Sequence, residues 1–239
     1  MRIKGVFDLF WVKKCVACDE LLEYDTKEYL CPKCYVEWEA AKNERCPVCQ
    51  KRECKCSCGN RNKLYVDFVR HLALYEPYER EYVVNRIVYA LKNSNNDDVF
   101  EFVAHEMVKE FSLKENMRNT VIVSVPRNPS SIRKYGYDHA MKLAKRVAEL
   151  TGIEYVDALR HRGGKREQKQ LRMIQRLENA KKNCYIRAES AEKIRGKHIL
   201  LIDDIVTTGA MTGACAQLLK QSGALSICCY LAAKNDSGS

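Results

Sequence analysis

Hydrophobic residues switch between helical and strand-like spacing along the chain from residue 80 onward. The segments REYVVNRIVYALKN (80–93), DDVFEFVAHEMVKEF (97–111) and YDHAMKLAKRVAEL (137–150) carry apolar residues at the 3.6-residue period of a helix. Short apolar runs predict strands at 121–126, 154–159, 197–202 and 225–233, and a further helix is expected near 212–222. Strands that alternate with helices predict an α/β fold with a mostly parallel, doubly wound sheet.

The stretch LLIDDIVTTGAMTGA places two adjacent carboxylates, Asp203 and Asp204, at the carboxyl end of a predicted strand. Ligands of doubly wound sheets collect at such ends. The loop TTGAMT then leads into a helix amino terminus, where N–H groups and the helix dipole favour a phosphate. Two carboxylates would repel that phosphate unless they face the hydroxyls of an attached sugar or a divalent cation. The pattern therefore predicts a site for a ribose 5-phosphate.

The cysteines divide the chain into two parts. Nine of the thirteen lie between Cys15 and Cys58, and no secretory signal is expected at the amino terminus. A reducing, cytoplasmic location is therefore expected, in which closely spaced thiols bind metal more often than they form disulfides. We expect a cysteine-rich module at 1–63 and a core-forming domain at 64–239, joined near GNRNK (59–63), and no run of about 18 apolar residues that would span a membrane.

The first two knuckles, CVAC and CPKC, match the spacing of a structural zinc ribbon. Four thiolates would close the coordination sphere of one Zn(II), so the site is expected to be structural, with no open position for a substrate. Its predicted ligands are Cys15, Cys18, Cys31 and Cys34.

A second zinc site is expected at the third knuckle, CPVC, which supplies Cys46 and Cys49. The other two ligands come from Cys54, Cys56 and Cys58, and the spacing does not say which two bind. Two alternatives stay open: a cross-braced arrangement that pairs the first knuckle with the third, and unmetallated thiols. The four later cysteines lie in apolar surroundings and are expected to be small buried residues.

Positive charge is concentrated in one segment. Of the net charge of +10, residues 160–197 carry 13 − 4 = +9. Such a segment forms a solvated basic helix, an anion-binding flap over the site or a nucleic-acid track. So uneven a distribution favours a polyanionic partner.

The motif LLIDDIVTTGAM resembles the phosphoribosyl-pyrophosphate (PRPP) signature of type I phosphoribosyltransferases. The double cysteine module, YALK at 89–92, VP at 125–126, a Q-x2-L-x4-R-x2-N pattern starting at Gln168 and this signature occur in the same order in ComF-type proteins, so the resemblance covers almost the whole chain. It implies a phosphoribosyltransferase fold, a role in natural competence, binding of single-stranded DNA and of PRPP with Mg(II), and partners in the DNA-uptake machinery.

The resemblance assigns the catalytic positions to Asp203 and Asp204. The implied substrate-binding residues are Thr207, Thr208, Gly209, Ala210, Thr212, Arg127, Arg133 and Lys134. Two departures concern pyrophosphate: the family's RGFNQA stands here as YGYDHA (135–140), and Met211 replaces a usual threonine. Arg133 or Lys134 is expected to compensate for Tyr135, and His139 is expected to cap or pack rather than to catalyse.

Three functions fit the sequence. The first is a ComF-type competence factor that binds single-stranded DNA and keeps a PRPP pocket. The second is a nucleotide-salvage phosphoribosyltransferase that transfers ribose 5-phosphate from PRPP to a nucleobase or amine. The third is a PRPP-responsive regulator without turnover. The cysteine module favours the first, because the resemblance includes it.

Overall fold

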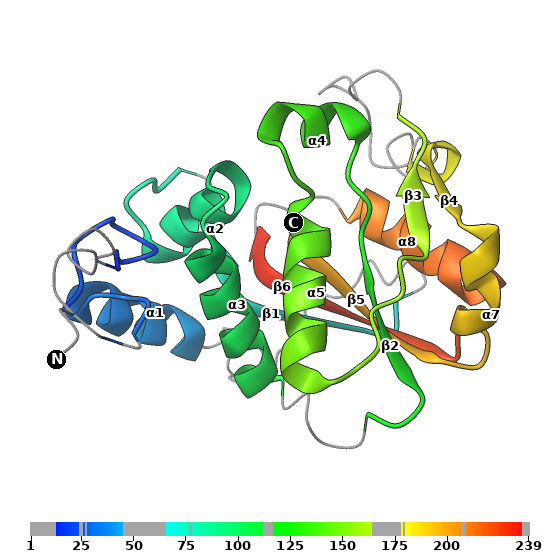
Figure 1. Cartoon of the computed structure of the whole chain (residues 1–239), viewed down its shortest axis with the longest axis horizontal. Coiled ribbons are helices and arrows are strands. Elements are labelled where there is room, and N and C mark those ends of the chain that lie inside the picture. The colour runs from blue at the N-terminus through cyan, green and yellow to red at the C-terminus, as the bar shows by residue number, and fades with distance from the viewer. Residues whose placement is uncertain are drawn as a thin grey trace, which may run out of the picture.

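A four-stranded parallel sheet forms the centre of the protein (Figure 1). The computed structural model describes residues 13–23, 26, 28–44, 66–76, 78–111, 117–163, 178, 180–206 and 209–235. The strands are β1 (Phe68–Tyr75), β2 (Thr120–Ser124), β5 (His198–Val206) and β6 (Ser226–Asn235). Their order is β1-β6-β5-β2, and all three pairings are parallel. The predicted α/β class and parallel sheet are confirmed.

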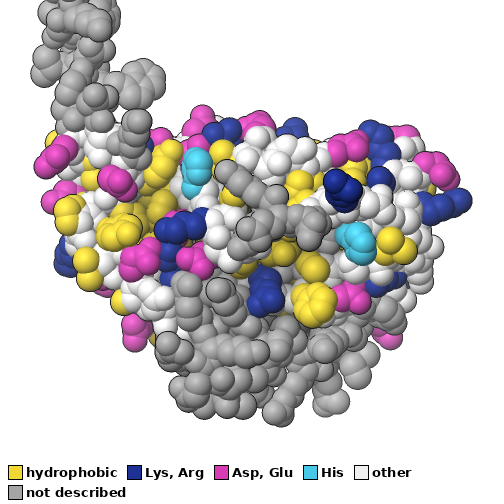
Figure 2. Space-filling model, turned by 90° about the horizontal axis from the view of Figure 1, so that it is seen from below, with side chains coloured by type: hydrophobic (Ala, Val, Ile, Leu, Met, Phe, Trp, Pro, Cys, Tyr) yellow, Lys and Arg dark blue, Asp and Glu magenta, His cyan; other side chains and the backbone are white. Residues whose placement is uncertain are grey.

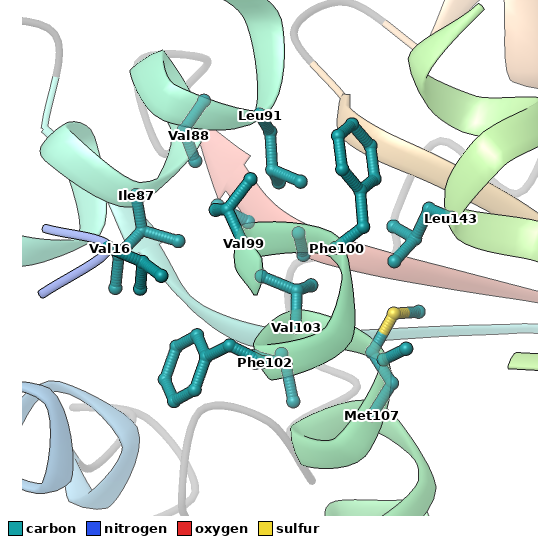
Figure 3. Packing of buried hydrophobic residues seen from close by; sticks show 14 of the residues in the cluster. Val16, Ile87, Val88, Leu91, Val99, Phe100, Phe102, Val103, Met107 and Leu143 are labelled. Atoms are coloured by element: carbon teal, nitrogen blue, oxygen red, sulfur yellow. The ribbon is translucent and has the colours of Figure 1, made fainter. Parts of the chain in front are cut away.

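Helices cover both faces of this sheet because successive strand residues point to opposite sides. Ile122, Leu200 and Ile202 join one hydrophobic cluster with α2 (Val83–Asn93), α3 (Asp97–Glu110) and α5 (His139–Thr151). Figure 3 shows the centre of this cluster. The neighbouring residues Val121, Val123, Ile199 and Leu201 belong to a second cluster that includes side chains of α8 (Ala210–Gln221). The sheet is therefore doubly wound, as predicted.

A small antiparallel ribbon stands beside the sheet. It consists of β3 (Leu159–His161) and β4 (Cys184–Ile186), followed by the short helices η3 (Ala188–Ser190) and α7 (Ala191–Ile194). The strand predicted at 154–159 is mostly wrong. Only Tyr155 pairs with the main sheet, in a parallel bridge to Ile122, because the chain then leaves the sheet to form β3.

The amino-terminal part packs directly on the larger domain. Helix α1 (Pro32–Asn43) begins after Cys31, and Pro32 occupies its first turn, where the missing N–H costs nothing. Val16, Leu30 and Trp38 share one buried cluster with residues of α2 and α3. The predicted boundary at 59–63 lies outside the described residues.

Three differences from the predicted elements concern the site. Strand β5 continues through Asp203 and Asp204 to Val206, instead of ending at residue 202. Helix α8 begins at Ala210, two residues earlier than predicted. A short helix, α4 (Pro129–Tyr135), follows β2 and had not been predicted.

Candidate functional site

Strand β2 ends beside the middle of β5, which continues farther along the sheet. The last register pair between them is Ser124 with Ile202, and the chain of β2 then turns away at Pro126. On its other side β5 stays paired with β6 as far as Val206. The two aspartates therefore lie within a strand, but beside the position that β2 has left, at the sheet edge where doubly wound folds bind ligands.

Asp204 is buried against a single guanidinium group. Its side chain is 2% exposed, and Oδ2 lies 2.5 Å from Nη2 of Arg127. Oδ2 has no well-aligned hydrogen bond among the described residues, so the contact is an ion pair. Burial acts to raise the pKa of Asp204, but the positive charges of Arg127 and Lys92 and the hydrogen bond with Asp203 together outweigh it and lower the pKa to about 2. Asp204 is thus ionised.

The pKa of Asp203 is shifted in the opposite direction from that of Asp204. The Asp203 Oδ1 accepts a hydrogen bond of 2.9 Å from the Asp204 N–H. Burial, followed by the negative charge of Asp204, raises the pKa of Asp203 well above its usual value. The neighbouring carboxylates therefore titrate as a coupled pair, in which the second negative charge is unfavourable without a ligand. A sugar hydroxyl or a divalent cation would favour the fully ionised pair.

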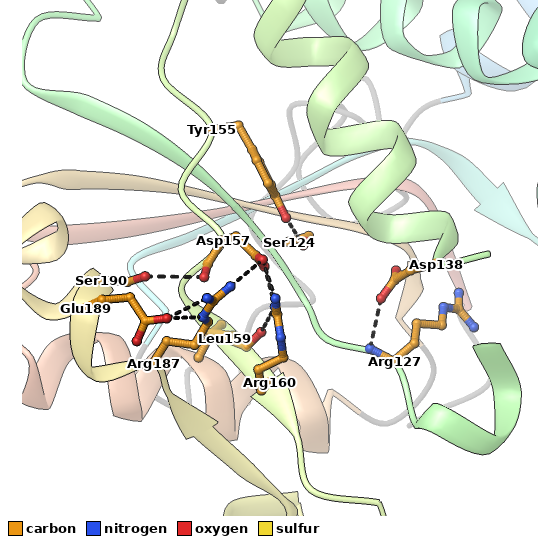
Figure 4. Close-up of polar contacts among 10 residues, drawn as sticks. All are labelled: Ser124, Arg127, Asp138, Tyr155, Asp157, Leu159, Arg160, Arg187, Glu189 and Ser190. Atoms are coloured by element: carbon orange, nitrogen blue, oxygen red, sulfur yellow. Dashed lines mark hydrogen bonds and ion pairs between the residues drawn. The ribbon is translucent and has the colours of Figure 1, made fainter. Parts of the chain in front are cut away.

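Both the backbone and the side chain of Arg127 contact aspartates, Asp138 and Asp204 respectively. The Arg127 N–H points to Oδ2 of Asp138 at 3.4 Å (Figure 4), and Oδ1 of Asp138 accepts a 3.0 Å bond from the Met141 N–H, which caps α5. Burial would lower the pKa of Arg127, but the charges of Asp204, Asp203 and Asp138 raise it. Arg127 therefore joins the loop after β2, the start of α5 and the end of β5.

The predicted cations Arg133 and Lys134 are both exposed, in the last turn of α4. Lys134 Nζ lies 4.8 Å from the ring centre of Tyr135. Arg127, which was also predicted to bind substrate, is the cation that faces the carboxylates. The expected compensation for Tyr135 by Arg133 or Lys134 stays a prediction.

The predicted phosphate loop is described only from Gly209 onward, so Thr207 and Thr208 lie outside the described residues. Gly209 has a φ of 71°, a left-handed conformation that glycine adopts without steric cost, and it precedes the first turn of α8. Ala210 and Thr212 are buried, and Ala210 packs with Ala180 and Ala214. Their role in phosphate binding stays a prediction.

Residues that sequence reasoning missed support the sheet edge from the side of β3. Ser124 Oγ and Tyr155 Oη are 3.0 Å apart. The Asp157 carboxylate pairs with Arg160, and its Oδ2 accepts a 2.8 Å bond from Arg187 Nη1 (Figure 4). These contacts tie the ribbon β3–β4 to the chain that flanks β2. The contacts of Ser124 with Tyr155 and of Asp157 with Arg187 were not predicted, because the partners lie 31 and 30 residues apart in the chain.

Part of the positive charge of the segment 160–197 is neutralised within the fold. Arg160 and Arg187 pair with Asp157, and Lys193 lies 3.0 Å from Glu154. Arg162 lies 4.6 Å from the ring centre of Tyr185. On the face shown in Figure 2, basic and acidic side chains of the described residues are interspersed. Residues 164–177 lie outside the described part and contribute 5 − 1 = +4.

The four predicted ligands of the first zinc site converge. The Sγ atoms of Cys15, Cys18, Cys31 and Cys34 all lie within 4.8 Å of one another. Cys18 Sγ and Cys31 Sγ are 3.7 Å apart, which fits the corners of a tetrahedron with Zn–S bonds of about 2.3 Å, for which S···S is about 3.8 Å. Burial raises the pKa of Cys31 to about 11, so a cation is required to hold this thiol as thiolate.

The local backbone explains this convergence. A tight hairpin between Lys14 and Leu21 presents Cys15 and Cys18, with Cys15 N–H donating to the Glu20 carbonyl at 2.8 Å. Cys31 precedes α1 and Cys34 lies in its first turn. Four buried or half-buried thiols therefore suggest a structural zinc module. The second predicted set, Cys46, Cys49, Cys54, Cys56 and Cys58, lies outside the described residues and stays a prediction.

No helix among the described residues combines the length and hydrophobicity that crossing a membrane would require.

The four later cysteines lie inside the fold or at its edge. Cys184, Cys215 and Cys229 are buried and Cys228 is half-buried, which confirms the predicted packing role for three of the four.

A curated protein is similar in sequence over most of this chain. The chain is 26% identical over 228 residues to the Competence protein ComFC of Streptococcus pneumoniae, an alignment that covers 88% of this chain and 95% of the relative. This similarity confirms the resemblance inferred from the motifs.

Two solved structures are similar to this chain at lower sequence identity. The allosteric regulatory enzyme of purine biosynthesis has a TM-score of 0.42 and 18% identity, covering 62% of this chain and 30% of that longer one. The phosphoribosylpyrophosphate synthetase of Mycobacterium smegmatis has a TM-score of 0.31 and 14% identity, covering 56% of this chain and 33% of that one. Each alignment thus spans about a third of the longer enzyme.

A family model described as a phosphoribosyl transferase domain matches residues 108–239. This match contains β2, β5 and both aspartates, and it covers more than half of the sequence. The chain therefore belongs to the phosphoribosyl transferase domain family.

Proposed function

We propose that this protein acts in DNA uptake as a ComF-type competence factor, binding PRPP with Mg(II) at the end of β5 and single-stranded DNA through its basic segment. The observation that carries the proposal is the Asp203–Asp204 pair beside Arg127, within a chain that aligns with 95% of a ComFC protein. That relative is named for competence, and an alignment over 88% of this chain extends beyond the 108–239 segment that the transferase family model matches.

The chemistry of the pocket supports PRPP as the ligand. Anionic acceptors suit the vicinal hydroxyls of a ribose, and the helix amino terminus after Gly209 suits its 5-phosphate. Mg(II) would be held by the pyrophosphate together with one or both aspartates, and it would neutralise developing negative charge. If transfer occurs, the protein has to position ribose and stabilise pyrophosphate around an oxocarbenium-like transition state; no side-chain nucleophile is needed.

The PRPP proposal is tested by isothermal titration of Mg–PRPP into the Asp203→Asn/Asp204→Asn double variant. Binding should be abolished, because the ribose hydroxyls lose their charged acceptors while the amides preserve the shape of the side chains. The matched control is Asp97→Asn/Asp98→Asn, which alters an equally adjacent pair at the start of α3. Equal affinity of the pocket variant and the parent would contradict the assignment.

The DNA proposal rests on the charge of residues 160–197, and its test is the salt dependence of oligonucleotide affinity. Each phosphate neutralised should contribute a log–log slope of about −0.7 for single strands. The quadruple variant Arg162→Ala, Lys165→Ala, Arg166→Ala and Lys169→Ala should flatten the slope by roughly two to three units and weaken all sequences alike. Its control removes four exposed charges elsewhere: Arg80, Lys109, Arg118 and Lys145. An unchanged slope in the first variant would leave the basic segment a solvated surface.

Membership of the transferase family favours a second function, salvage transfer from PRPP to a nucleobase or amine. Salvage transfer consumes PRPP and releases pyrophosphate, whereas the competence function requires only that PRPP binds. Release of pyrophosphate from PRPP in the presence of a panel of nucleobases and ammonia, abolished in the double variant, would establish the salvage function.

A further inference from the structure

The carboxyl end of α2 is joined to the amino end of α5 by side-chain hydrogen bonds. The Tyr137 hydroxyl lies 3.0 Å from the Leu91 carbonyl oxygen and 2.6 Å from that of Ser94. Nε2 of His139 lies 2.7 Å from the Lys92 carbonyl oxygen. The last carbonyls of a helix have no partner within the helix, so these side chains satisfy groups that otherwise require water. We call these contacts the α2–α5 lock.

The chemistry of His139 defines its form in the lock. A carbonyl oxygen only accepts, so Nε2 carries the proton. Burial, and then the positive charge of Arg127, lowers the pKa of His139 to about 4, so the ring is neutral at pH 7. The side chain is 1% exposed. It stacks on Tyr137 with ring centres 4.5 Å apart and meets the edge of Tyr135 at 5.5 Å. The ring therefore cannot turn without breaking the lock.

The residue between the two members of the lock contacts the pocket. Asp138 lies between Tyr137 and His139, caps α5 and accepts the backbone N–H of Arg127. The guanidinium group of Arg127 in turn pairs with Asp204. The positions of Asp138 and Arg127 therefore depend on how firmly the start of α5 is fixed.

We propose that Tyr137 and His139 are positioning residues, which anchor the start of α5 to α2 and thereby hold Arg127 against Asp204 in the geometry that receives PRPP. The inference rests on the proposed PRPP site and goes beyond it, because neither residue belongs to the predicted ligand set. His139 acts through a hydrogen bond and packing, and it transfers no proton.

The test compares Mg–PRPP affinity by isothermal titration in three variants of the lock. His139→Leu removes the donor to Lys92 and should weaken binding about tenfold, the effect of one lost hydrogen bond on a positioned site. Tyr137→Phe removes only a hydroxyl and should act in the same direction. His139→Gln restores an N–H donor and should recover most of the affinity. Full affinity in both His139→Leu and Tyr137→Phe would overturn the proposal.

A matched control separates positioning from general stability. Arg146→Ala breaks the ion pair between α5 and Glu101 of α3, farther along the same helix. It should lower the melting temperature as His139→Leu does, but leave PRPP affinity unchanged. An equal loss of affinity in Arg146→Ala would assign the effect to stability alone and contradict the lock.

A double-mutant cycle shows whether the lock acts through Arg127. In an Arg127→Met background, His139→Leu should change affinity by less than about twofold, because the group that it positions is gone. A full tenfold loss of PRPP affinity in that background would show that His139 does not act by positioning Arg127.

If the proposed PRPP site is wrong, the parent protein will not bind PRPP at all, and this result differs from a failure of the positioning role. The lock is still testable in that case by carboxyl-carbon NMR of Asp204, which needs no ligand. The pKa of Asp204, about 2 in the parent, should rise in His139→Leu and also in Tyr137→Phe, which removes only a hydroxyl, and it should stay unchanged in Arg146→Ala. An unchanged pKa in His139→Leu would overturn the positioning role.

Discussion

Asp203 and Asp204 are neighbours in one strand but have opposite electrostatic environments. Arg127 stabilises the charge of Asp204, whereas Asp203 has a backbone N–H as its hydrogen-bond donor and the charge of Asp204 beside it. The pair therefore stores an unfavourable interaction in the ligand-free protein. Such a cost is expected at a site whose ligand supplies the missing positive charge or hydroxyl donors.

The two isosteric variants should consequently shift stability in opposite directions. Asp203→Asn should raise the melting temperature at pH 7 by about 3 °C, because a neutral amide removes repulsion and desolvation of charge. Asp204→Asn should lower it, because Arg127 loses its buried partner. Scanning calorimetry of both variants measures this difference.

The stability difference between the parent and Asp203→Asn should depend on pH. The pKa of Asp203 is raised by folding, so its favourable contribution is present below the unfolded value of 3.8 and is lost as the pH rises through the folded value. The advantage of Asp203→Asn should therefore vanish near pH 3.5. An advantage that persists there would show that charge is not its cause.

Helix α1 begins inside the four-cysteine cluster. Cys31 precedes its first residue and Cys34 lies in the first turn, so bound metal would fix the start of this helix. The opposite end carries Lys42, which is buried and pairs with the half-buried Glu39, Glu106 and Glu110. Metal at one end and ion pairs at the other determine where α1 lies on the domain.

Removal of zinc should therefore unfold α1. Purified protein should contain close to two zinc ions, one of them at the described cluster, and Cys34→Ser should lose one ion and helical circular dichroism together. Cys228→Ser, on strand β6, is the cysteine control and should retain the full metal content. Folded parent protein with almost no zinc would contradict the metal assignment.

The cysteine module and the transferase domain share one hydrophobic cluster. The Trp38 indole N–H donates to Glu106 Oε2 at 2.7 Å, and Lys42 pairs with the same carboxylate. Burial would lower the pKa of Lys42, but Glu106 and Glu39 raise it, so the lysine is charged at this interface. The two parts of the zinc-loaded protein are therefore expected to unfold together.

Lys42→Met tests this coupling. Loss of the buried cation leaves the half-buried carboxylates of Glu39, Glu106 and Glu110 without their positive charge, which should destabilise the protein by about 2–3 kcal/mol. Urea unfolding followed by tryptophan fluorescence and by circular dichroism should show one coincident transition, at lower urea than in the parent. The exposed Lys33→Met on the same helix should have little effect. Two separate transitions in the parent would show that the parts are independent.

The sequence predicted what depends on local pattern. The strand with Asp203 and Asp204, the helix that follows and the first cysteine cluster each lie in short continuous motifs. Strand β1 was missed because Arg70 and His71 interrupt its apolar run, although pairing with β6 buries its centre. The role of Arg127 was only partly predicted, because its contact with Asp204 forms when β2 and β5 become neighbours.

The central claim is that the carboxylates at the end of β5 recognise the diol of a ribose phosphate. It is tested most directly by titrating the parent protein with ribose 5-phosphate and with 2-deoxyribose 5-phosphate. The account predicts that loss of the single hydroxyl weakens binding at least about tenfold, because a buried acceptor is left without its donor. Equal affinity for the two sugars would contradict it.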